Sequence, residues 1–243
     1  MKARRIAAAA VLAVVLGAGL ATAAEGVAGR FAVAAQVGTQ TEISGDLLRS
    51  GQGTVAVFPV TFDSVSYRDV YGPDVRVQGF LGYGVAERVE IVLRGGWYKS
   101  ENTGVRAGTF GDGDLFAYFS EYEEWGLELA ARYYIAHRSR LKSYLAPVAG
   151  LRSTNDIFVD YSLPAAGSSV LNVPFTKDTT VPVLGLDLGV SFDLTENLFI
   201  ALDSGIRWQG APTDANALTT LGSVDDSESR WTAPVLFSLG VRF

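Results

Sequence analysis

Carboxylates inside apolar segments are the first residues of this sequence that could perform chemistry. Glu128, Asp187 and Asp203 each stand among alternating apolar residues. Two such carboxylates held close together could share a proton and act as an aspartic catalytic dyad. A guanidinium beside each carboxylate would instead give buried ion pairs with a structural role. We favour the structural interpretation, because arginines are as frequent as acids in these segments. They are Arg76, Arg94, Arg132 and Arg207.

The single histidine, His137, lies in the stretch AHRSRL, where we expect a short turn. A catalytic base must lie beside a nucleophile and an acid, and a lone histidine in a turn gives no sign of such a cluster. We interpret His137 as a solvated turn residue. The chain has no cysteine, which excludes thiol catalysis and cysteine-ligated metals. We therefore expect no catalytic residue and no cofactor, and we expect that the protein is not an enzyme.

Acidic residues among glycines could bind calcium at two places. The stretch GDGD contains Asp112 and Asp114, and the stretch VDDSE contains Asp225, Asp226 and Glu228. Neither stretch has the complete set of oxygen ligands of a calcium-binding loop. We favour solvated acidic loops and expect no metal site.

The first 24 residues have the pattern of a cleaved secretory signal peptide. Basic residues at positions 2, 4 and 5 precede an apolar run over residues 6–20, and small residues follow. The run is shorter than the roughly 20 residues that a transmembrane helix needs. We expect cleavage after residue 23 or 24, so that residues 25–243 form the folded domain.

The charge of the mature segment argues against one class of partner. Residues 25–243 carry 17 basic and 26 acidic side chains, a net charge of −9. A nucleic-acid surface needs clustered lysines and arginines, so we expect no nucleic-acid partner.

In eight segments, apolar residues recur at every second position, which is typical of strands with one apolar face. These strands must position the charged side chains. Short links alternate with four long connections, at about 41–73, 99–121, 153–180 and 209–229. Alternation of this kind predicts an all-β, closed, antiparallel, up-and-down transmembrane β-barrel. The eight segments are 30–40, 74–83, 89–98, 122–135, 141–152, 181–194, 198–208 and 231–243.

The number of strands has one alternative. The apolar stretch TVAVFPVTF, residues 54–62, could extend a strand or add a hairpin, which would make ten strands. Pro59 argues against a central strand at this place, because proline cannot donate to the ladder.

The polar face of these strands predicts what fills the barrel. Glycines alternate with charged residues on this face, as expected where side chains must fit a narrow lumen. We expect Arg94, Glu128, Asp187 and Asp203 to lie in one hydrogen-bonded network that blocks the lumen, since charges away from water must be paired. The expected lumen residues are Arg76, Gln78, Glu90, Arg94, Glu124, Glu128, Arg132, Asp187, Asp203 and Arg207.

The apolar face predicts contact with lipid and two aromatic girdles. In the expected strand directions, all four tryptophans fall at the ends near the long connections, whereas other aromatic residues fall near the short turns. Such girdles anchor a barrel at the two membrane interfaces. The first girdle is Trp97, Trp125, Trp208 and Trp231; the second is Phe31, Tyr83, Tyr133, Phe192 and Phe243.

The final strand carries a resemblance to a known family. Phe237, Leu239, Val241 and Phe243 resemble the terminal assembly signal of outer-membrane β-barrel proteins, with alternating apolar residues and a final aromatic. The chain as a whole resembles the small eight-stranded barrels of the outer-membrane protein A, protein X and opacity-protein type. The resemblance implies the outer membrane of a Gram-negative bacterium, contact with its lipid and lipopolysaccharide, and insertion by the barrel-assembly machinery.

This fold hosts several functions, so three remain open. The first is a structural or surface-interaction role through the long extracellular loops, with an unknown extracellular ligand. The second is a narrow channel for small or hydrophobic solutes. The third, an enzyme that modifies membrane lipids, is the weakest, because it would need a cluster of serine, histidine and an acid near the loops, whereas the single histidine lies in a short turn.

Overall fold

The structure is a computed structural model that describes residues 26–55, 58–136, 140–164, 167–215 and 227–243. The predicted signal peptide and His137 lie outside these ranges, and the cleavage site stays a prediction. Within these ranges, no helix is long and apolar enough to cross a membrane.

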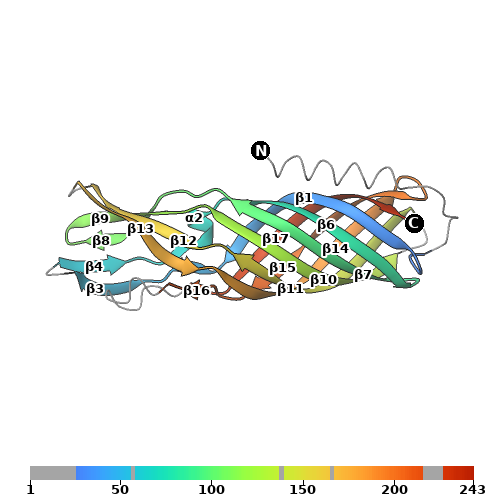
Figure 1. Cartoon of the computed structure of the whole chain (residues 1–243), viewed down its shortest axis with the longest axis horizontal. Coiled ribbons are helices and arrows are strands. Elements are labelled where there is room, and N and C mark those ends of the chain that lie inside the picture. Colours follow the sequence, from blue (N-terminus) through green and yellow to red (C-terminus); the bar gives the residue numbers. More distant parts are fainter. Residues whose placement is uncertain (1–25, 56–57, 137–139, 165–166, 216–226) are drawn as a thin grey trace.

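Eight antiparallel strands close into a barrel, which confirms the predicted fold class and strand number (Figure 1). The last strand pairs with the first, from Ala32 opposite Arg242 to Ser44 opposite Trp231. Closure satisfies the backbone groups that would otherwise form an open edge, which lipid does not tolerate. The barrel strands are β1 (Phe31–Ser44), β6 (Asp74–Ala86), β7 (Val89–Ser100), β10 (Tyr122–Ala136), β11 (Leu141–Thr154), β14 (Thr179–Asp193), β15 (Leu198–Gln209) and β17 (Arg230–Arg242).

The four long connections, expected as loops, contribute strands to a second sheet at one end of the barrel (Figure 1). Its strand order is β16-β13-β12-β9-β8-β4-β3, so strands from all four connections meet. Alternate side chains of β4, β9 and β12 are apolar and buried, which gives the sheet a core of its own. The strands are β3 (Gly51–Val55), β4 (Phe58–Phe62), β8 (Val105–Phe110), β9 (Gly113–Phe119), β12 (Ile157–Leu163), β13 (Ser168–Lys177) and β16 (Thr213–Asp214).

The stretch 54–62 belongs to this second sheet, so the alternative of a ten-stranded barrel is wrong. Its two halves form the hairpin of β3 and β4, outside the barrel. Pro59 lies beyond the ladder between β4 and β8, which covers only Val60–Phe62. Its missing N–H therefore costs no hydrogen bond in that ladder.

The first long connection also contains β2 (Asp46–Leu48), β5 (Val65–Ser66) and α2 (Tyr67–Val70), and β2 pairs with β5. The helix α2 lies where the barrel and the second sheet meet (Figure 1). Ser66 and Asp69 form a capping box, in which the Asp69 N–H donates to Ser66 Oγ and the Ser66 N–H donates to Asp69 Oδ2. Tyr67 and Val70, three positions apart, bury one face of the helix in the core of the second sheet.

The opposite end of the barrel carries short turns and the C-terminus (Figure 1). Arg30 donates through Nη2 to the carbonyl oxygen of Glu196 in the turn between β14 and β15, at 2.7 Å. The two ends of the barrel therefore differ, with a folded sheet at one end and tight connections at the other.

This difference predicts a topology. A protease site inserted between Gly111 and Asp112, in the turn between β8 and β9, should be cleaved on intact cells, because the second sheet should face outward. The same insertion between Glu87 and Arg88, in the turn between β6 and β7, should resist protease until the outer membrane is permeabilised. Cleavage at 87–88 on intact cells would reverse the orientation.

Candidate functional site

The four tryptophans lie as two cross-strand pairs near the end that carries the second sheet. Trp97 on β7 faces Trp125 on β10, and Trp208 on β15 faces Trp231 on β17. Trp125 and Trp231 are exposed on the outside of the barrel. The four residues of the predicted first girdle therefore form two cross-strand pairs, each on two neighbouring strands.

Other aromatic residues lie outside the barrel near the short turns. The Phe31 ring packs against Tyr83, with centroids 4.7 Å apart, and its centroid lies 6.2 Å from that of Phe243. Tyr133 and Phe192 are exposed on β10 and β14. All five rings of the predicted second girdle lie near the short turns, and their contact with a membrane interface stays a prediction.

An apolar band separates the two girdles. On β10 it runs from Trp125 to Tyr133 and includes Leu127 and Leu129, which are more than half exposed. At about 3.3 Å per residue and a tilt of about 40°, these eight steps cover about 20 Å along the membrane normal, close to the band of about 25 Å in transmembrane barrels. The outer surface is therefore suited to lipid.

The final strand follows the same pattern with one exception. Phe237, Leu239 and Phe243 are exposed on the outer face, whereas Val241 is 4% exposed. The Phe243 N–H donates to the Phe31 carbonyl at 3.0 Å, and its carbonyl accepts from the Phe31 N–H at 2.8 Å. The last residue thus closes the ladder to the first strand.

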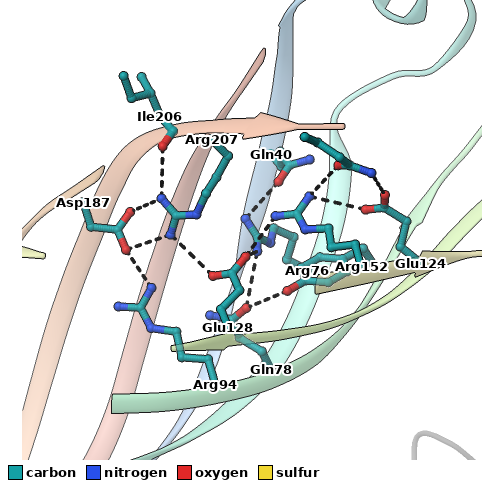
Figure 2. A network of polar contacts seen from close by, with 12 residues as sticks. Gln40, Arg76, Gln78, Arg94, Glu124, Glu128, Arg152, Asp187, Ile206 and Arg207 are labelled. Carbon is teal, nitrogen blue, oxygen red and sulfur yellow. Dashed lines mark hydrogen bonds and ion pairs between the residues drawn. The ribbon is translucent and has the colours of Figure 1, made fainter. Parts of the chain in front are cut away.

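Inside the barrel, Glu128 lies at the centre of a group of arginines (Figure 2). Its Oε1 accepts from Arg152 Nη2 at 3.1 Å and from Arg76 Nη2 at 3.5 Å. Its Oε2 accepts from Arg207 Nη2 at 3.5 Å. Since these arginines come from β11, β6 and β15, one carboxylate on β10 links four strands.

Asp187 lies next to this centre and has the shortest ion pairs of the group. Arg207 donates to both of its oxygens, at 2.6 and 2.8 Å, in a bidentate pair (Figure 2). Arg94 Nη1 donates to Oδ2 at 2.6 Å, and Arg94 Nη2 lies 3.8 Å from Asp203 Oδ1. One arginine therefore lies between the two aspartates, as two neighbouring ionised carboxylates require.

Toward the short turns, Arg132 continues the chain of ion pairs. Its Nη2 lies 3.5 Å from Asp203 Oδ2, and its Nη1 donates to Glu90 Oε2 at 3.2 Å. The guanidinium is 4.6 Å from the ring centroids of both Phe80 and Tyr144. These ring faces attract the cation where water is excluded.

Two further groups complete this end of the lumen. Tyr134 donates its hydroxyl to Glu90 at 2.8 Å and accepts from Arg242 Nη2 at 3.2 Å. Arg242 Nη1 also donates to Asp193 at 2.7 Å, and Lys142 pairs with the same carboxylate. The polar contacts therefore reach the short turns.

Toward the second sheet, Arg230 closes the other end. It pairs with Glu124 at 2.7 Å and with Glu42 at 3.1 Å. Its guanidinium lies between the rings of Tyr67 on α2 and Tyr122, 4.7 and 4.6 Å from their centroids. Burial raises the pKa of Tyr67 to about 12, so this phenol stays neutral at physiological pH.

We use the name lumen network for the connected side chains that these contacts define. Each neighbouring pair is joined by an ion pair, except for the step through the hydroxyl of Tyr134. In order, they are Glu42, Arg230, Glu124, Arg152, Glu128, Arg207, Asp187, Arg94, Asp203, Arg132, Glu90, Tyr134, Arg242, Asp193 and Lys142, with Arg76 attached at Glu128.

Glycines on the inner face leave room for these large side chains. A Cβ at Gly185 would lie 2.5 Å from Cδ of Arg207, and a Cβ at Gly189 would lie 2.3 Å from Cζ of Tyr144. A side chain at Gly185 would displace Arg207, and a side chain at Gly189 would displace Tyr144, whose hydroxyl donates to Asp203. The alternation of glycine with charge in the sequence therefore has a direct steric reason.

All ten residues expected in the lumen are buried there, each no more than 4% exposed. Seven members of the lumen network were not among these ten: Glu42, Tyr134, Lys142, Arg152, Asp193, Arg230 and Arg242. Arg152 lies on the inner face of an irregular predicted strand that contains Pro147, and its alternation with Leu151 could have revealed it. Glu42 and Arg230 lay just outside the predicted strands, because the first predicted strand ended four residues too early and the last began one residue too late.

The two acidic stretches considered for calcium have other partners. Asp114 accepts from Arg106 Nε at 2.8 Å, and Glu228 pairs with Arg49. Asp225 and Asp226 lie outside the described residues. Among the side chains that the structure describes, no group of three or more His, Cys, Asp or Glu residues could hold a metal ion.

A closed barrel with charges inside and apolar side chains outside has the reverse of the polarity of a water-soluble barrel. Together with the two girdles, this polarity defines an integral outer-membrane β-barrel protein.

No family model matches the chain, and no curated protein does so. Among solved structures, the chain is similar to Neisserial surface protein A, with 16% identity over 88% of this chain and 99% of that chain and a TM-score of 0.46. It is also similar to the outer membrane protein OprG from Pseudomonas aeruginosa, with 15% identity over 90% and 97% and a TM-score of 0.46. The protein class assigned above rests on this chain's own geometry.

The lumen network generates a prediction for stability. Arg207→Ala should lower the free energy of unfolding by roughly 3–5 kcal/mol, because it leaves the buried carboxylate of Asp187 without its bidentate partner. Unfolding by urea in lipid or detergent measures this loss. Arg106→Ala is the matched control, because its ion pairs with Asp63 and Asp114 are solvent-exposed. Equal, small effects of the two substitutions would show that the lumen pairs do not stabilise the barrel.

Proposed function

We propose that this protein has no enzymatic activity and is a surface protein whose closed barrel anchors a folded extracellular sheet for interaction with a partner outside the cell. The observation that carries this proposal is the lumen network, which runs from α2 to the short turns. A barrel of about eight strands encloses only enough space for side chains to fill. Filled in this way, the barrel serves as an anchor rather than a passage.

Both ends of the lumen support this proposal. At the second sheet, Arg230 is held between two tyrosine rings, and the apolar core of the sheet lies beyond it. At the short turns, Arg242 and Lys142 share the carboxylate of Asp193. A solute would have to break several buried ion pairs in succession, each costly to separate.

The second sheet supports a role in surface interaction. Its inner face contains a buried cluster that includes Phe62, Phe119 and Phe175, so strands from different connections are fixed relative to one another. Binding residues on a rigid support lose little conformational entropy when a partner binds. We propose that outer-membrane lipid and lipopolysaccharide contact the exposed girdle residues, and that the partner contacts the sheet.

Conductance separates this function from the alternative of a narrow channel. The refolded protein in a planar bilayer should show almost no steady single-channel current, because the network leaves no continuous aqueous path. A variant that removes two cations at the centre, Arg94→Ala with Arg207→Ala, should increase current if it still folds. A large and stable current through the unmodified protein would favour the channel.

The final residue generates a prediction for assembly. Deleting Phe243 removes two backbone hydrogen bonds to Phe31 and the terminal aromatic ring of the proposed signal for the barrel-assembly machinery. Folded protein in the outer membrane should decrease while unfolded protein accumulates in the periplasm, as measured by heat-dependent migration on gels. Phe243→Tyr keeps the ring and the backbone and should assemble normally. A normal folded yield after the deletion would contradict the proposed signal.

A further inference from the structure

The outer face of the second sheet carries aromatic side chains, of which Tyr118 is exposed and Phe116 and Phe158 are half-buried. On β9, Phe116 and Tyr118 point away from the core, whereas Leu115, Ala117 and Phe119 point into it. On β12, Phe158 and Asp160 point outward in the same way. We call Phe116, Tyr118, Phe158 and Asp160 the aromatic face.

Tyr118 is held in a fixed position on this face. A Cβ at Gly104 would lie 2.3 Å from Cε1 of Tyr118 and 2.6 Å from its Cδ1, so the ring lies across the backbone at this glycine. Tyr118 nevertheless remains 50% exposed. One side of the ring is therefore supported and another is presented to solvent.

Asp160 lies directly opposite Tyr118 on the neighbouring strand. Its Oδ1 accepts the backbone N–H of Asn172 at 2.5 Å, which fixes the carboxylate beside the ring. Asn172 adopts a φ of +59°, a conformation that asparagine tolerates better than most residues. A fixed carboxylate next to an exposed aromatic ring suits a cation, since the ring face and the negative charge both attract it.

The charge of the whole second sheet favours the same ligand class. The segments that connect barrel strands at this end, residues 45–73, 101–121, 155–178 and 210–229, contain 14 acidic and 4 basic residues. Their net charge of −10 exceeds the −9 of residues 25–243 as a whole. Arg106, on the strand next to Phe116, is already paired with Asp63 and Asp114. The resulting field attracts cations from a distance.

The spacing of the rings indicates a polypeptide rather than a small amine. Phe116 and Tyr118 are two residues apart on one strand, about 6.6 Å. Alternate side chains of an extended peptide repeat at the same distance, so successive side chains of such a peptide would meet successive rings.

We propose that the aromatic face binds an extended, arginine- or lysine-rich polypeptide segment, with one cationic side chain on the Tyr118 ring and paired with Asp160. This inference rests on the proposed function, because it names the chemistry of the partner. Phe116 and Phe158 contact the stems of neighbouring cationic side chains, which are apolar along most of their length.

A labelled nine-residue arginine peptide tests this proposal. Its binding to the protein in nanodiscs of zwitterionic lipid is measured by fluorescence anisotropy near physiological salt. Tyr118→Ala and Asp160→Asn should each weaken binding roughly fivefold or more, the size expected for a cation–ring or charge-assisted contact. Asp112→Asn, in the nearby turn after β8, removes the same charge away from the face and should change binding by less than about twofold.

Several results would overturn the proposal. Equal weakening by Asp112→Asn and Asp160→Asn, with no effect of Tyr118→Ala, would show attraction by the general field alone. Equal binding of a glutamate peptide or a neutral oligosaccharide would exclude a cation-specific face. Folding of each variant is checked by heat-dependent migration, and Tyr118→Phe, which keeps the ring, should bind like the unmodified protein. Absence of peptide binding in a barrel that carries no current would overturn this inference and leave the anchor function intact.

Discussion

A charged side chain that is withdrawn from water must be paired with an opposite charge. The arrangement of the barrel strands depends on that requirement. Eight cationic side chains and seven carboxylates meet in the lumen network, so almost every charge has an opposite neighbour. Removing one partner of a pair would leave the other charge unpaired in a medium of low dielectric constant, which is costly. The pairs come from different strands, and the network therefore also fixes how the strands are arranged around the axis.

The same requirement separates the protein into two parts with different cores. Within the membrane, the apolar side chains face lipid and the core is polar. In the second sheet, water lies outside, and the core is apolar again, with residues such as Phe119 and Val159 fully buried. Tyr67 and Tyr122 join the two, because both rings belong to the apolar core and both stack on Arg230 of the polar one. The cores of the barrel and of the second sheet are thus in contact through these two side chains.

Much of the barrel could be predicted from the sequence, because a period of two is local information. It indicated which residues face the lumen, and it placed the tryptophans near one end. The pairing of Trp97 with Trp125 follows from strand order and register. The second sheet could not be predicted, since its strands are short and come from four separate connections. Nothing in the local pattern of residues 105–119 indicates that they pair with residues near 60 and 160.

Nine of the sixteen members of the network were predicted, but their contacts were not. The sequence places Asp187 and Arg207 on the inner face of adjacent strands, whereas the bidentate geometry depends on rotamers and on the space left at Gly185. Glu42 and Arg230 were missed because barrel strands extend beyond the apolar band, into a region where the outward residues become polar and the period is harder to detect. Strand ends are thus less well defined by pattern than strand centres.

A double-mutant cycle between Arg207 and Asp187 tests the central claim most directly. The free energies of unfolding of Arg207→Ala, Asp187→Ala and the double variant are compared with that of the unmodified barrel. If buried pairing holds the lumen together, removing both charges should cost less than the sum of the single losses, with a coupling of about 1–3 kcal/mol. Losses that add to within about 0.5 kcal/mol would contradict the account, because they would show that the two groups act independently.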